Sequence, residues 1–303
     1  MRVLITGASG AIGESLVRAL AGRHELRGLA REPSRVSGAL ELVRGDALSG
    51  EGLERALEGI DTAYYLIHSM EPAVADSFEA RDRAAAERFA AAAAQAGVKR
   101  IVYLGGLHSG DGPSSAHLES RGEVEQILLA AVPDSVALRA SLVIGARSRS
   151  FRAIVRLVER LPVIPLPPWR RHRTQPIDER DAIAYLVAAA ETADVGGRSY
   201  DIAGAELLSY GEMIVRIASL LLLERPIVRL PLDPRALASA FAARASGESH
   251  ELLGPLMGSL RGDLIADDTA ARAAFEIPPL HGFDAAVEHA LREWEASEPL
   301  GAR

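Results

Sequence analysis

Three glycines near the start of the chain constrain its fold more than any other feature. Gly7, Gly10 and Gly13 are spaced G-x-x-G-x-x-G, directly after an apolar run and directly before a helix-forming run at 14–21. A strand, a glycine turn and a helix N-terminus in this order form a site for a pyrophosphate, because the unpaired N–H groups of the helix face the negative charge. Glycines also mark ordinary turns, so the dinucleotide prediction depends on the position of this motif at the start of an α/β alternation.

Each glycine has its own predicted role. Gly7 permits the tight turn, Gly10 lets the backbone approach the phosphates, and Gly13 lets the helix and the strand pack closely. Ser9 adds a hydroxyl donor. The residues that we expect to surround the phosphates are therefore Gly7, Ser9, Gly10, Ala11, Ile12 and Gly13.

The totals exclude several classes of protein. The chain of 303 residues has a net charge of −7, which argues against a nucleic-acid-binding surface, and no cysteine, which excludes disulfides and thiolate chemistry. No apolar run approaches the ~20 residues of a membrane span. No signal peptide is expected, because the first residues lead directly into an apolar strand. We expect a cytoplasmic protein with no nucleic-acid or membrane partner. The eight histidines show no metal-ligand spacing, and the oligomeric state stays open.

Strands and helices alternate over the first two thirds of the chain. After the first strand we expect strands at 25–30, 41–44, 61–67, 100–104, 136–144 and 198–203, and helices at 11–21, 50–57, 75–96, 118–131 and 178–191. This spacing predicts an α/β fold with a doubly wound parallel sheet of the Rossmann type. In such sheets ligands lie outside the carboxyl ends of the strands.

The pattern changes on the C-terminal side. A helix at 151–161 leads into a proline-dense loop at 162–176. After residue 205, amphipathic helices surround a short apolar strand at 226–231; they are expected at 210–223, 234–245, 250–260, 267–275 and 284–295. We therefore expect a dinucleotide-binding domain formed by 1–145 and 176–204, and a smaller, mainly helical substrate lid formed by 146–175 and 205–303. Segments 146–175 and 206–262 are expected to line an apolar pocket that faces the nicotinamide.

The end of the second strand predicts which dinucleotide binds. Sites for NAD place a carboxylate there for the ribose 2′-OH, whereas an arginine suits the 2′-phosphate of NADP. This strand ends Leu29-Ala30-Arg31, with no acid before Glu32. Arg31 therefore predicts NADP(H); the alternative is a solvated loop arginine.

Other predicted cofactor contacts follow the neighbouring strands. Asp46, beside Ala47, can accept a hydrogen bond from the adenine amino group, and it can also act as a turn residue or as the N-cap of the next helix. Leu66, His68 and Gly105 stand at the ends of two further strands, on the ligand-binding edge. His68 is expected near the nicotinamide ribose, where a structural hydrogen bond and a chemical role both remain open.

Several segments together carry a family resemblance; they are Thr6-Gly7-x-x-Gly10-x-x-Gly13, Gly45-Asp46, Ala63-Tyr64-Tyr65-Leu66-Ile67-His68-Ser69-Met70, Tyr103-Leu104-Gly105-Gly106 and Gln175-Pro176-Ile177. Over residues 1–205 the chain resembles the short-chain dehydrogenase/reductase superfamily, and more narrowly its atypical branch near the NmrA-like proteins. The resemblance implies a Rossmann domain that binds NAD(P)(H). It also implies a tyrosine and a lysine four residues apart on the helix after the fifth strand, where the tyrosine donates a proton and the lysine holds the ribose.

The chain departs from that family pattern at the proton donor. Lys99 is its only lysine, and no tyrosine lies four residues before it. His117 and Arg121 stand at the corresponding place, four residues apart and so on one helical face. Arg121 can bind ribose hydroxyls or phosphate but cannot act as an acid. His117 is either a proton donor or a partly exposed histidine bonded to a loop, and with Arg121 and His68 it forms the predicted catalytic set. The usual serine is also displaced, with Ser109 further along the loop.

Two classes of function remain. The first is an NADPH-dependent reductase, of ketoreductase type, acting on a carbonyl or a conjugated double bond of a bulky apolar metabolite, aromatic ones included. The cofactor supplies the hydride, and the proton comes from His117, from water or from the substrate itself. The second is a catalytically silent NAD(P)-binding sensor or scaffold of NmrA-like type. An isomerase or epimerase is a third, weaker interpretation without the tyrosine. The apolar composition of the lid favours the reductase.

Overall fold

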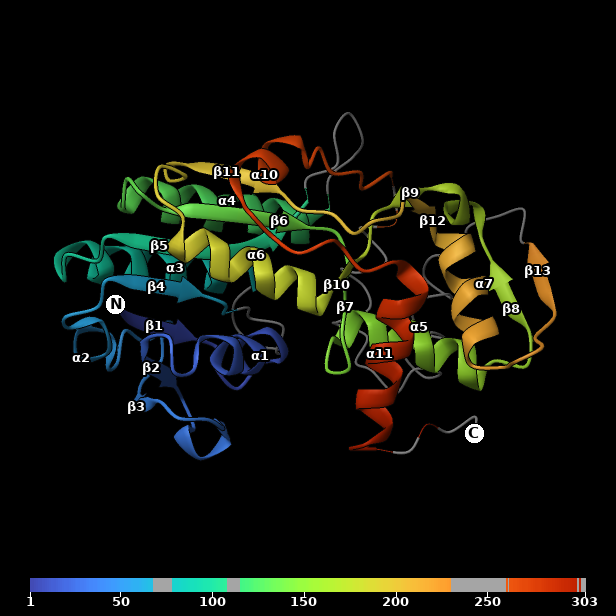
Figure 1. The fold of residues 1–303 in the computed structure, drawn as a ribbon, viewed down its shortest axis with the longest axis horizontal. Coiled ribbons are helices and arrows are strands. Elements are labelled where there is room, and N and C mark those ends of the chain that lie inside the picture. The colour runs from blue at the N-terminus through green and yellow to red at the C-terminus, as the bar shows by residue number, and fades with distance from the viewer. Residues whose placement is uncertain (68–77, 108–114, 230–259, 261, 299, 301–303) are drawn as a thin grey trace.

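The computed structural model describes residues 1–67, 78–107, 115–229, 260, 262–298 and 300. Its centre is a seven-stranded sheet with the order β11-β6-β5-β4-β1-β2-β3, in which all neighbouring strands are parallel (Figure 1). The strands are β1 (Arg2–Thr6), β2 (Glu25–Ala30), β3 (Glu41–Arg44), β4 (Thr62–Tyr65), β5 (Arg100–Gly106), β6 (Val136–Ala140) and β11 (Arg198–Asp201). The predicted doubly wound sheet is confirmed. The strand order reverses between β1 and β4, where open α/β sheets bind their ligands.

Helices cover both faces of the sheet. On one face lie α1 (Ala11–Leu20), α6 (Glu179–Glu191) and α10 (Thr269–Ala274), and on the other α2 (Leu53–Leu57), α3 (Phe78–Gln95) and α4 (Ala116–Ala131). Side chains alternate along β1, so that Val3 and Ile5 join the first core and Leu4 joins the second. All three side chains are fully buried. Because helices cover both faces of the sheet, both sides of this strand need apolar residues, and its sequence is a continuous apolar run.

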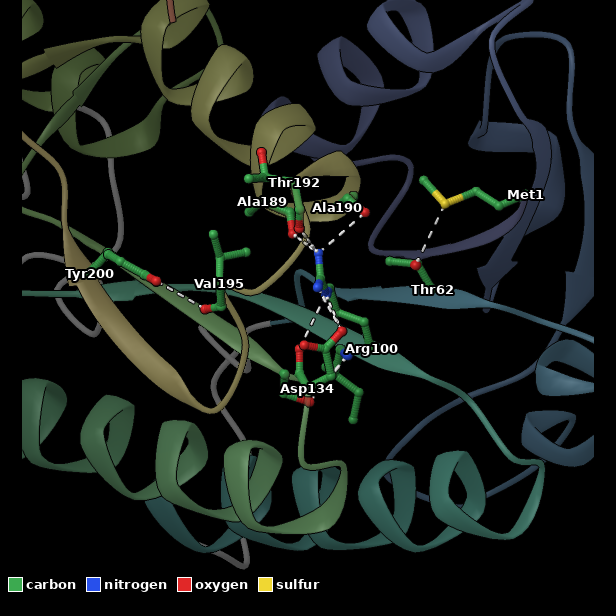
Figure 2. Close-up of polar contacts among 11 residues, drawn as sticks. Met1, Thr62, Arg100, Asp134, Ala189, Ala190, Thr192, Val195 and Tyr200 are labelled. Atoms are coloured by element: carbon green, nitrogen blue, oxygen red, sulfur yellow. Dashed lines mark hydrogen bonds and ion pairs between the residues drawn. The ribbon is translucent and has the colours of Figure 1, made fainter. Parts of the chain in front are cut away.

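A buried arginine ties the sheet to the end of α6. Arg100 begins β5 and is 7% exposed. Its guanidinium donates to the carbonyl oxygens of Ala189 and Thr192, at 2.9 and 2.7 Å, and pairs with the Asp134 carboxylate at 2.6 Å (Figure 2). A cation at a helix C-terminus satisfies the free carbonyl groups and the negative end of the helix dipole. Arg100 thus fixes α6 at the amino edge of the sheet, opposite the ligand-binding edge.

A second group of elements has its own core beside the sheet (Figure 1). Its larger elements are α5 (Arg149–Arg160), α7 (Tyr210–Leu220), α11 (Phe283–Glu295) and the parallel pair β8 (Ile164–Leu166) and β13 (Ile227–Arg229). Phe151, Met213 and Trp294 are fully buried in this core. The remaining short elements are β7 (Val143–Ile144), β9 (Arg173–Thr174), β10 (Ile177–Asp178), β12 (Leu208–Ser209), η1 (Pro33–Arg35) and η2 (Pro168–Arg171).

Two segments have more secondary structure than the sequence predicts. The strand expected at 136–144 is interrupted at 141–142, because β6 stays in the sheet while β7 leaves it to pair with β10. The loop expected at 162–176 contains β8, which is held by its parallel partner β13. In both cases the pairing partner lies far along the chain, and a local pattern cannot show it.

The C-terminal part differs from the predicted lid at α10. Phe275, which follows α10, packs edge-on against Tyr185 and Tyr200 in the core of the sheet, whereas the predicted division assigns 205–303 wholly to the lid. The helix expected at 234–245, and all but the last residue of the one expected at 250–260, lie outside the described residues. Within the described part of the chain, no helix is long and apolar enough to cross a membrane, and no cluster of His, Cys, Asp or Glu is suited to a metal ion.

Candidate active site

The glycine loop between β1 and α1 has the geometry that its spacing predicts. Gly7 has a φ of +67°, and a Cβ there would lie 2.7 Å from the Leu66 carbonyl oxygen. A Cβ on Gly13 would lie 2.2 Å from the Gly7 carbonyl oxygen, so only glycine lets α1 pack this close to the strand. Gly10 caps α1 in an extended conformation, and within the described part of the chain its Cβ would meet just the Gly7 carbonyl oxygen, at 3.1 Å. The outer side of the loop is therefore open to a ligand.

A cleft of about 1090 Å³ brings the predicted residues together. It extends from the glycine loop, past the carboxyl ends of β2, β3, β4 and β5, to α5 and α7. This volume is slightly above the range of about 300–1,000 Å³ for a single small-molecule site, which suits a cofactor and a substrate together. The predicted residues that line it are Gly7, Ser9, Gly10, Ala11, Ile12, Gly13, Arg31, Asp46, Ala47, Leu66, Gly105, His117 and Arg121. His68 and Ser109 lie outside the described residues.

The residues predicted for the adenosine end lie at one end of the cleft. Arg31 is exposed at the rim, and the nearby acid Glu32 pairs with Arg35 at 2.7 Å. The Asp46 carboxylate accepts a hydrogen bond from the Leu48 N–H at 2.9 Å, so the predicted turn role is confirmed. The predicted N-cap role is wrong, because Gly52 caps α2. An ionised carboxylate keeps further acceptor positions, which can serve an adenine amino group.

His117 and Arg121 lie one turn apart on α4, and both line the cleft. The helix starts two residues before the predicted position, because Ser115 caps it by accepting from the Leu118 N–H at 3.3 Å. Arg121 is buried beside Gly106 of β5. Burial, and then the positive charge of Arg121, lower the pKa of His117 to about 4. The imidazole is therefore neutral at neutral pH, and its ring lies 6.1 Å from that of Phe78.

The far end of the cleft is an apolar compartment. Its walls come from α5, α7 and the chain between them, and include Ile154, Leu157, Ile164, Trp169, Met213 and Ile214. Trp169 and Tyr210 meet edge to face, with ring centroids 6.4 Å apart. Burial raises the pKa of Tyr210 to about 12, so its hydroxyl stays protonated. The Trp169 indole N–H is buried and has no hydrogen-bond acceptor among the residues that the structure describes. Both predicted lid segments, in their described parts, contribute to this compartment.

Three arginines that line the cleft, Arg81, Arg147 and Arg149, have no signal in the sequence, and Arg147 contacts the glycine loop. Arg147 lies in the turn between β7 and α5, and its Nη2 donates to the Ser9 carbonyl oxygen at 3.1 Å. It also forms an ion pair with Glu14, in the first turn of α1. Sequence patterns miss this residue, because Arg147 and Ser9 are 138 positions apart in the chain and only the fold brings them together.

The comparisons with known proteins agree with this geometry. Residues 7–141 match the family model described as NAD(P)H-binding. The (4-alkanoyl-5-oxo-2,5-dihydrofuran-3-yl)methyl phosphate reductase of Streptomyces griseus is 28% identical over 229 residues, which are 72% of this chain and 73% of that protein. The ceramide reductase of Caulobacter vibrioides is 26% identical over 242 residues, which are 78% and 75% of the two chains.

Solved structures share the whole fold. A UDP-glucuronic acid 4-epimerase from Bacillus cereus in complex with NAD has a TM-score of 0.74 at 17% identity, covering 100% of this chain and 99% of that one. A short-chain dehydrogenase/reductase superfamily protein from Agrobacterium tumefaciens with bound NAD has a TM-score of 0.70 at 19% identity, covering 98% and 99%. At these identities the likeness concerns the fold alone. Residues 7–141 thus match an NAD(P)H-binding family model within a Rossmann-like fold, and the chain is similar in sequence to two proteins named as reductases.

Proposed function

We propose that the protein is an NADPH-dependent reductase of a carbonyl group on a bulky apolar metabolite. The observation that carries this proposal is the single cleft that joins the glycine loop to the apolar compartment. A dinucleotide laid along the carboxyl edge of the sheet has its phosphates at α1, and its nicotinamide is then directed toward the compartment. The two relatives named as reductases support the same class of reaction.

The residues present fit such a cofactor. The open outer side of Gly10 admits the pyrophosphate to the first-turn N–H groups of α1. We propose that Arg121, a cation that lines the cleft, holds the ribose in the way that a lysine does in the family that the chain resembles. When bound, the cofactor supplies a hydride. The chain's own contribution is to orient the carbonyl, to exclude water through the apolar walls, and to leave a route for one proton to the new alkoxide oxygen.

Arg31 is expected to select NADPH over NADH. Because the arginine is exposed, its charge-assisted bonds to a 2′-phosphate should contribute about tenfold in affinity, at the low end for such bonds. Arg31→Ala should therefore lose about tenfold for NADPH and keep its affinity for NADH. Fluorescence titration of the wild type and of Arg31→Ala, each with NADPH and with NADH, checks this. Equal affinities of the wild type for NADPH and NADH would contradict it.

The proton is expected to come from water or from the substrate rather than from His117. With a pKa of about 4, the imidazole carries its extra proton in only about one molecule in a thousand at neutral pH. His117→Phe should therefore keep kcat within about tenfold, a barrier change below ~1.4 kcal/mol. The kcat profile should show no inflection near the ordinary histidine pKa.

A proton donor role for His117 predicts a different result. The variant would then lose about 10²–10⁴-fold in kcat. Wild-type activity would fall as pH rises through the pKa of the imidazole, because only the protonated ring donates easily. Arg121→Ala serves as the companion variant. It should weaken cofactor binding, and unchanged binding and turnover in both variants would remove this face of α4 from the site.

The direct test of the proposed function is reduction of bulky apolar ketones by the purified protein with NADPH. Reduction of such ketones, with small polar ketones left untouched, is the expected result. Tight NADPH binding without turnover of any ketone would instead favour the silent sensor or scaffold.

A further inference from the structure

Arg147 holds a position that the cofactor contacts described above do not use. It lines the cleft, and its Nη2 lies 3.1 Å from the carbonyl oxygen of Ser9, in the middle of the glycine loop. Its side chain is 51% exposed, so the Ser9 and Glu14 contacts leave part of it open to a ligand. The cation thus lies beside the N-terminus of α1, where the positive end of the helix dipole already favours an anion.

The acid that pairs with Arg147 belongs to the same helix end. Glu14 stands in the first turn of α1 and is 31% exposed. A partly exposed ion pair contributes little to folding, in the range of 0–1 kcal/mol for surface pairs, so exchange of this partner for another anion costs little. A guanidinium binds two phosphate oxygens at once in a planar fork, which a carboxylate at one side does not prevent.

We infer that Arg147 binds the pyrophosphate of the dinucleotide, and that Glu14 orients the guanidinium before the cofactor arrives. This inference rests on the proposed binding of a dinucleotide along the glycine loop. The pyrophosphate is then held from two sides, by the backbone N–H groups of α1 and by a side chain from the turn after β7. The Ser9 carbonyl contact fixes the distance of the guanidinium from the loop.

The position of Arg147 also connects the cofactor to the substrate compartment. Arg147 lies two residues before α5, and Ile154 and Leu157 of that helix line the apolar walls. A phosphate contact at Arg147 therefore holds the start of α5 against the glycine loop. The bound cofactor and the wall of the compartment share one anchoring residue.

Three ligands distinguish the contribution of the pyrophosphate to binding from that of the other parts of the cofactor. NADP⁺ and NAD⁺ both contain it, whereas adenosine 2′-monophosphate has the 2′-phosphate but no pyrophosphate. The full chain is titrated with each ligand by calorimetry, as wild type, Arg147→Ala, Arg147→Lys and Arg18→Ala. Arg18 is the matched control, because it is an exposed arginine of α1 that pairs with Glu293 and does not line the cleft.

Arg147→Ala is expected to lose about tenfold or more in affinity for NADP⁺ and for NAD⁺ alike, and to bind adenosine 2′-monophosphate as the wild type does. Arg147→Lys should recover part of the loss, and Arg18→Ala should lose nothing. Unchanged dinucleotide affinity in Arg147→Ala would overturn the inference, as would an equal loss for adenosine 2′-monophosphate. A wild type that binds neither dinucleotide would refute the proposed function itself, and this inference with it.

Discussion

Gly10→Ala is expected to weaken NADP(H) binding about a hundredfold while leaving the fold nearly intact. Among the described residues, the added methyl group meets one protein atom, the Gly7 carbonyl oxygen at 3.1 Å, and Gly10 has the φ of an ordinary residue, −78°. Loss of folding stability should therefore stay near the ~1 kcal/mol of a poorer N-cap. The same methyl group stands where the phosphates must approach the backbone, and overpacking of about 1–3 kcal/mol there reaches a hundredfold in affinity.

Two other glycine variants act as controls for this prediction. Gly262→Ala should change neither binding nor stability, because its Cβ meets no atom of the described residues within 4 Å. Gly13→Ala should lose both, since its Cβ would lie 2.2 Å from a backbone oxygen. Cofactor titration and thermal unfolding of all three variants check the pattern. Full NADPH affinity in Gly10→Ala would mean that the phosphates do not lie on this loop.

Ile214→Trp is expected to lower kcat/KM for a bulky apolar ketone about a hundredfold, with NADPH affinity unchanged. Ile214 is a partly buried residue of α7 that lines the apolar compartment, so the larger ring fills space that the substrate needs. Steric exclusion of this kind costs about 1–3 kcal/mol in the transition state.

The neighbouring residue provides the matched control. Val215 follows on the same helix but is 37% exposed and does not line the cleft. Val215→Trp should therefore keep full kcat/KM. Equal losses in the two variants would place the effect in the stability of α7 and not in the compartment. Steady-state kinetics at saturating NADPH give kcat/KM for the ketone in both variants.

Much of the nucleotide half could be predicted from the sequence, because its signals are local. The turn at Gly7 and the close packing at Gly13 follow directly from the spacing of the glycines, and the structure confirms both. The strand alternation likewise predicts the parallel sheet. His117 and Arg121 line one cleft because four residues make about one helical turn.

The remaining features depend on contacts between distant segments. β8 is a strand only because β13 pairs with it, and β7 leaves the apolar run at 136–144 only because β10 receives it. Arg147 reaches the glycine loop because the chain leaves the sheet at β7, so no local motif marks this residue. Burial lowers the pKa of His117, and a sequence does not show how deep a side chain will lie.

We expect hydride to pass from NADPH to a carbonyl held in the apolar compartment, and this transfer is the central step of the proposed function. Its most direct test uses NADPH deuterated at C4 of the nicotinamide, the purified protein and a panel of bulky apolar ketones, with the alcohols analysed by mass spectrometry. We predict one deuterium on the carbinol carbon of the product, from a single face of the nicotinamide, and loss of this transfer in Gly10→Ala. Tight NADPH binding with no deuterium in any product would contradict the claim.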